Sequence, residues 1–165
     1  MPPRLRTCLG VALVFSAGTA AAAPRALPSL SLVDARGAVV ADSALTQSSN
    51  WVLLVVDADK PLTASVLPRL QRKDGDWAGK VVVVAVGAPS AFARMVAHNA
   101  KLSGVRWCRD TTGRLLERLE LSGTPVLLGV RPDNVIAWQM ATIPEMPEKA
   151  QAVVTGWTAR PGPEQ

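Results

Sequence analysis

One cysteine stands in a setting that favours chemistry at its sulfur. Cys108 lies in the short run 105–109, where Arg106 and Arg109 are close neighbours. Nearby guanidinium groups lower the pKa of a thiol and raise the fraction of thiolate, which is the nucleophile and the metal ligand. This pattern is the argument for a single-thiol site with redox or peroxide chemistry, or for metal sensing. The interpretation that we favour is structural, because a free cysteine often serves as a small buried hydrophobic residue.

The remaining ionisable residues suggest no metal or acid–base cluster. Asp57 and Asp59 are only two carboxylates, a thin ligand set, so we interpret them as caps for the helix that follows. Lys60 is expected near the start of that helix, where a cation opposes the helix dipole, so it is either an anion contact or a solvated loop lysine. His98 is the sole histidine and is interpreted as a surface residue of a helix. We expect no metal and no cofactor.

The elements that must position these residues alternate between apolar runs and helical patterns. Continuous Val-rich runs are typical of strands buried on both faces of a sheet. The predicted strands are 52–56, 81–86, 105–109 and 126–130, with hairpins pairing 29–34 with 38–40 and 126–130 with 135–140. The predicted helices are 62–72, one opening at Pro89 with Ser90 as its N-cap, one over 115–119 and one over 147–157. Parallel strand–helix–strand units followed by a hairpin and a terminal helix predict an α/β sandwich.

Several short motifs occur together in an order that a known family shares. They are the opening run 27–34 with its Leu-Pro-Ser-Leu-Ser-Leu-Val-Asp sequence, Leu-Pro-Arg-Leu at 67–70, Asp-Thr-Thr-Gly at 110–113 and Gly-Thr-Pro at 123–125. With these motifs the chain resembles the thioredoxin-like superfamily, and most closely its secreted TlpA-like and peroxiredoxin-like branches. The resemblance covers about residues 27–157. It implies a thioredoxin-like three-layer α/β/α sandwich with a central mixed sheet and an N-terminal β-hairpin.

The same resemblance indicates a binding surface that has lost its sulfur chemistry. The two cysteines of the family's Cys-x-x-Cys motif fall on Lys60 and Thr63, and Pro61 matches the proline between them. A hydroxyl cannot replace a thiolate, because it is not appreciably ionised near neutral pH. Thr124 and Pro125 match the family's cis-proline loop, whose main-chain groups can pair with an extended peptide. We call Lys60, Pro61, Thr63, Thr124 and Pro125 the docking surface.

The N-terminus predicts export. Residues 1–22 have the basic, apolar and small-residue regions of a signal peptide, with cleavage expected after Ala22. The apolar stretch is short for a stable membrane span, which needs about 20 residues. Cys8 would leave with this segment, so the mature chain keeps Cys108 alone and cannot form an internal disulfide. We expect a lead-in over 23–28, the folded domain over 29–157, a disordered tail over 158–165, and a periplasmic or secreted location.

Charge and motifs exclude several functional classes. The formal net charge of +5 falls by two to +3 without Arg4 and Arg6, and the remaining charges form no basic block, so nucleic-acid binding is not expected. No serine-hydrolase elbow or phosphate loop is present. The function predicted from the residues is a redox-inactive, exported thioredoxin-fold protein that serves as a protein- or peptide-binding or assembly module in the cell envelope. Its expected partner is an unidentified envelope protein or peptide. The alternatives are a monothiol oxidoreductase or peroxide-reacting enzyme using Cys108, and a structural accessory of a secretion or conjugation machine.

Overall fold

The computed structural model describes residues 23–45, 47–60, 66–67, 79–102, 104–141 and 147–160. The predicted signal peptide therefore lies outside the described residues, as do Pro61, Thr63 and most of the predicted helix 62–72. Within the described ranges, no helix is both long enough and apolar enough to cross a membrane.

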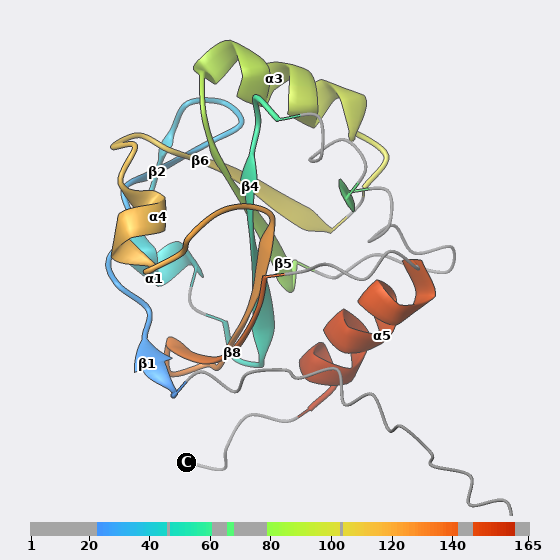
Figure 1. Cartoon of the computed structure of the whole chain (residues 1–165). Coiled ribbons are helices and arrows are strands. Elements are labelled where there is room, and N and C mark those ends of the chain that lie inside the picture. Colours follow the sequence, from blue (N-terminus) through green and yellow to red (C-terminus); the bar gives the residue numbers. More distant parts are fainter. Residues whose placement is uncertain are drawn as a thin grey trace, which may run out of the picture.

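A mixed sheet forms the middle layer, with helices on both sides of it (Figure 1). The described residues contribute eight strands to this sheet, in the order β1-β8-β7-β4-β5-β6-β2-β3. The strands are β1 (Arg25–Ala26), β2 (Leu32–Asp34), β3 (Val39–Val40), β4 (Trp51–Asp57), β5 (Val81–Val86), β6 (Val105–Asp110), β7 (Val126–Val130) and β8 (Val135–Met140). Strands β4, β5 and β6 are parallel neighbours, whereas β7 is antiparallel to β4 and to β8. The β2–β3 hairpin joins the sheet through β2, which pairs antiparallel with β6. The predicted mixed sheet and N-terminal hairpin are confirmed.

Side chains of the central strand alternate between two separate cores, one on each face of the sheet. Val52, Leu54 and Val56 of β4 belong to one core, and the strand residues between them belong to the other. Because successive side chains of a strand point to opposite faces, a fully buried strand requires cover on both sides. Helices α3 (Pro89–His98) and α5 (Pro147–Thr158) cover the first core, while α1 (Asp42–Leu45) and α4 (Leu115–Arg118) cover the second. This is the predicted three-layer α/β/α sandwich.

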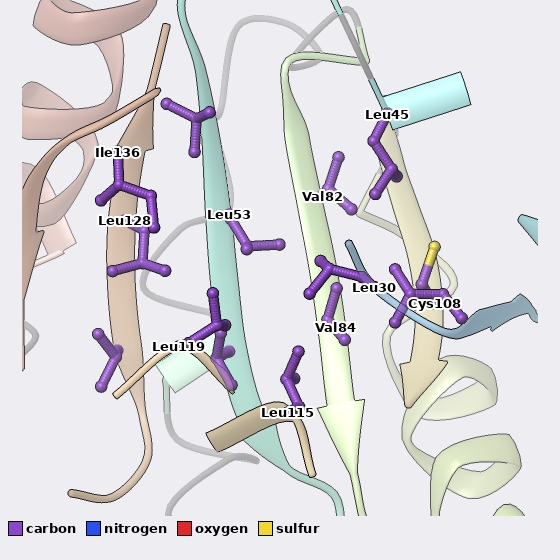
Figure 2. Close-up of a cluster of buried hydrophobic side chains, with 14 of the residues drawn as sticks. Leu30, Leu45, Leu53, Val82, Val84, Cys108, Leu115, Leu119, Leu128 and Ile136 are labelled. Atoms are coloured by element: carbon purple, nitrogen blue, oxygen red, sulfur yellow. The ribbon is translucent and has the colours of Figure 1, made fainter. Parts of the chain in front are cut away.

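The second core also contains the thiol. Leu115 and Leu119, from α4 and the residue after it, pack with Val84 and Leu53 of the central strands (Figure 2). Cys108 of β6 lies in the same cluster and has no exposed surface. Its side chain is thus part of the packing between sheet and helix layer.

Three local expectations need correction. The N-cap of α3 is Ala88 rather than Ser90, because Pro89 occupies the first helical position, where its fixed φ suits a helix start. The segment 23–28, expected to precede the folded domain, contains β1, which pairs with β8 and so belongs to the sheet. The last helix extends through Thr158, whose buried hydroxyl donates a hydrogen bond to the Val154 carbonyl, so Thr158 belongs to the folded domain and not to the expected tail. Residues 161–165 lie outside the described residues.

Candidate functional site

The turn that follows β4 carries the first residue of the docking surface. The Asp57 carboxylate accepts a hydrogen bond of 3.0 Å from the main-chain N–H of Asp59. The main-chain N–H of Lys60 donates to the Asp57 carbonyl at 3.2 Å, and its ammonium lies 3.5 Å from the Asp57 carboxylate. Asp57 therefore closes an Asx-type turn and pairs with Lys60. The Lys60 side chain is 56% exposed, so this ion pair contributes little to stability but leaves the ammonium accessible to a ligand.

Asp59 connects this turn to helix α3. Its carboxylate accepts a 3.0 Å hydrogen bond from the main-chain N–H of Ala88, the N-cap of α3. The contact passes over Gly87, where an added Cβ would lie 2.5 Å from the Asp59 carboxylate oxygen and where φ is +114°. This bond joins the turn to the start of a helix 29 residues further along the chain, whereas the start of the helix that Asp57 and Asp59 were expected to cap lies outside the described residues. Among the described residues, no group of three acidic, histidine or cysteine side chains could hold a metal ion.

Thr124 and Pro125 lie beside the same end of the sheet. They immediately precede β7, and the antiparallel register pairs Val126 with Val55 near the carboxyl end of β4. The Thr124–Pro125 peptide bond is cis, and both residues are partly exposed. The 57–60 turn follows β4, and the Thr124–Pro125 loop precedes β7. Because β4 and β7 are antiparallel neighbours, both segments lie at the same end of the sheet. The other two residues of the docking surface lie outside the described residues.

A cavity of about 300 Å³ lies on the α3 side of the 57–60 turn. We call it the α3 cavity; it is lined by Ala58, Lys60, Ala91, Arg94, Met95, His98 and Asn99. His98 is exposed, as predicted, but it also stands on this rim. The cavity was not anticipated from the sequence. The usable signal was the helical spacing of Ala91, Arg94 and His98, which places one small and two polar residues on a shared face.

The structure confirms the structural interpretation of Cys108 as a small buried residue of a strand. Burial raises the pKa of Cys108 from 9.0 to about 11; the Arg106 guanidinium lowers it and the Asp34 carboxylate raises it, both less than burial does. Arg106 donates to the main-chain carbonyl of Ala44 and Arg109 to that of Asp110, so both cations are engaged elsewhere. The lowered thiol pKa expected from the two arginines was wrong, because sequence spacing does not report desolvation.

The Asp-Thr-Thr-Gly motif is a structural cap. The buried Asp110 carboxylate accepts hydrogen bonds from the Thr112 N–H at 3.1 Å, the Thr112 hydroxyl at 2.9 Å and the Leu115 N–H at 3.2 Å. The last of these satisfies a donor at the first residue of α4. The motif thus sets where α4 begins, on the way from β6 to the Thr124–Pro125 loop.

Comparison with solved structures identifies the architecture. No known family model and no curated protein matches the sequence. A thioredoxin-family thiol:disulfide interchange protein from Chlorobium tepidum is 16% identical, with a TM-score of 0.64 over 84% of this chain and 99% of its own. A secreted disulfide oxidoreductase from Mycobacterium tuberculosis is 17% identical, with a TM-score of 0.57 over 78% and 96%. An uncharacterized conserved protein from Geobacillus kaustophilus is 17% identical, with a TM-score of 0.65 over 86% and 85%. At such identities the similarity shows the fold and not the activity. This chain has the thioredoxin-like fold.

Proposed function

We propose that this protein is a redox-inactive thioredoxin-fold module that is exported and binds an extended segment of a partner protein. Its binding site is the docking surface at the end of β4 and the start of β7. The partner segment pairs with exposed main-chain groups there, as in other proteins that bind peptides in extended form.

The observation that carries the proposal is the burial of Cys108. Disulfide exchange requires a thiolate that can reach the other sulfur. After removal of residues 1–22 the chain has one cysteine, and its side chain has no exposed surface and a pKa of about 11. The position that carries a cysteine in redox members of the resembled family holds Lys60, whose ammonium is exposed. The scaffold therefore retains surface chemistry suited to binding and lacks a reactive thiol at that surface.

The binding test is site-specific crosslinking in cells. A photoreactive amino acid at position 124 should give a discrete crosslinked partner from the envelope fraction. Lys60→Glu should remove most of this product, because it reverses the one charge of the described docking surface. Lys149→Glu, which makes the same charge change at an exposed position of α5, should leave the yield unchanged. No discrete product from position 124 would show that the surface binds nothing, and equal yields from all three proteins would show that Lys60 takes no part in binding.

Export has its own test. The mass of the protein recovered from the periplasm or medium should correspond to a chain that begins at Ala23. Recovery of the uncleaved chain only from the cytoplasm would contradict the localisation without bearing on the binding surface.

The neighbouring solved structures favour one alternative, a thiol–disulfide oxidoreductase. For this chain such an enzyme would have to use Cys108. An insulin-reduction assay of the purified protein separates the two functions: we expect no activity above the uncatalysed rate, and turnover that disappears in Cys108→Ala would establish the enzyme. The third function, a structural accessory of an envelope machine, would appear as a stable multiprotein complex in the crosslinking experiment.

A further inference from the structure

The α3 cavity is assembled by contacts that fix its two walls relative to each other. The Asp59 carboxylate accepts a hydrogen bond from the N–H of Ala88, the N-cap of α3, which joins the 57–60 turn to the start of that helix. Gly87 allows this close approach because it has no Cβ. Lys60 follows Asp59 directly, while Arg94 and His98 lie on α3. The cavity is therefore held open between two defined elements.

The chemistry of the lining is divided between floor and rim. Ala58, Ala91 and Met95 supply an apolar surface, and the last two are buried in the packing of α3. Lys60, Arg94 and His98 supply hydrogen-bond donors, two of them permanently cationic near neutral pH. Within the described part of the chain, no ion pair or hydrogen bond uses the Arg94 or His98 side chain. The rim is thus suited to an anionic group and the floor to an apolar one.

We infer that the α3 cavity binds a short organic carboxylate, with its carboxylate between Lys60 and Arg94 and its apolar part over Met95. Arginine can hold a carboxylate through two parallel hydrogen bonds. A volume of about 300 Å³ corresponds to roughly ten water-sized groups at about 30 Å³ each. That is enough for an amino-acid-sized carboxylate, at the lower end of ligand pockets. Inorganic phosphate would leave the apolar floor unused.

The cavity shares Lys60 with the docking surface, but Thr124 and Pro125 do not line it. Its test varies Arg94, which is not part of the docking surface, so the inference can fail or hold separately from the proposed peptide binding. The carboxylate has two possible sources, a free short-chain acid or the C-terminal residue of a peptide. Hexanoate represents the first and N-acetyl-leucine the second. N-acetyl-leucinamide is the matched neutral probe, since an uncharged carboxamide of similar size replaces the carboxylate of N-acetyl-leucine.

The experiment is a titration of the purified protein, labelled at its methionine methyl groups, followed by NMR. The Met95 methyl should shift with a saturable, millimolar dissociation constant, which is the expected range for a probe of this size. The Met140 methyl, on β8, should not shift. The amide should bind at least about tenfold more weakly, because it loses the charge-assisted hydrogen bonds. Binding by only one of the two acids identifies the source of the carboxylate.

A pair of variants completes the test. Arg94→Gln should weaken binding by about three- to tenfold, a range reduced to allow for the exposure of this side chain. Lys149→Gln removes the same charge from α5 and should leave affinity unchanged. A Met95 methyl that does not respond to either acid, equal affinity for acid and amide, or no effect of Arg94→Gln would each overturn the inference.

Discussion

The contact between Gly129 and Trp138 allows a sharp test of the packing beneath α5. These residues face each other across β7 and β8, and a Cβ at position 129 would lie 2.0 Å from the indole nitrogen and 2.1 Å from its neighbouring ring carbon. Trp138 in turn meets Trp157 of α5 edge to face, with ring centroids 5.8 Å apart and an interplanar angle of 85°. Gly129→Ala must therefore displace the indole ring.

The expected cost follows from the two contacts that move. Overpacking costs about 1–3 kcal/mol, and loss of the aromatic pair costs about 0.5–1.5 kcal/mol. Replacing glycine by alanine in a strand offsets about 0.5–1 kcal/mol of this cost, because alanine loses less backbone freedom on folding. We expect the free energy of unfolding to fall by about 0.5–4 kcal/mol, measured by urea denaturation with tryptophan fluorescence. The decrease should be visible as a lower denaturation midpoint with an unchanged slope.

Two comparison proteins separate the clash from a general effect of glycine replacement. A Cβ at Gly156, within α5, meets no atom within 4 Å, so Gly156→Ala should stabilise the protein by about 0.5–1 kcal/mol. In a Trp138→Ala background, Gly129→Ala should cost almost nothing, because the ring it would displace is gone. Stability of the single Gly129→Ala variant equal to or above that of the parent protein would refute the reasoning.

Two further predictions concern buried polar groups. The pKa of Cys108 rises from 9.0 in the unfolded chain to about 11 in the folded protein. Its contribution to the free energy of unfolding is therefore complete below pH 9, and it is lost as the pH rises to 11, because only the unfolded chain ionises in that range. That loss amounts to about 2–3 kcal/mol. In Cys108→Ala, the free energy of unfolding measured by denaturation should vary less between pH 9 and pH 11. The chain has no tyrosine, whose ionisation would add to the change in this range. Asp110→Ala leaves the buried Leu115 N–H without its partner and should cost about 1–3 kcal/mol by denaturation, whereas Asp133→Ala, at an exposed ion pair, should cost less than about 1 kcal/mol. Equal losses in the two aspartate variants would show that Asp110 is not the cap described here.

Most strands and the order of elements could be predicted from short windows of sequence. The runs 52–56, 81–86 and 126–130 are continuously apolar, and only burial on both faces of a sheet accommodates such runs. The strands β4, β5 and β7 cover them and exceed them by at most one residue at each end. By contrast, β1 has only two residues and α1 only four, which is too short for any periodic pattern to indicate them.

The candidate site was predictable only in part. Lys60 and Thr124–Pro125 were placed by resemblance, and strand pairing brings their loops to one end of the sheet. Asp59 bonds to Ala88, a contact across 29 residues that short windows of sequence do not report. Helical spacing groups Ala91, Arg94 and His98 on one face, but only the packing of α3 beside the 57–60 turn forms the α3 cavity.

By itself, the amino-acid sequence determined the alternation of strands and helices and the presence of a single cysteine, Cys108, beyond residue 22. These are properties of composition and of neighbours within a few residues. Only the tertiary structure decided that Cys108 is protonated and inaccessible, because its desolvation comes from packing in a core built by α1, α4 and the central strands. The same holds for Trp138 over Gly129 and for the cationic rim of the α3 cavity, since distances between remote residues depend on how whole layers pack together.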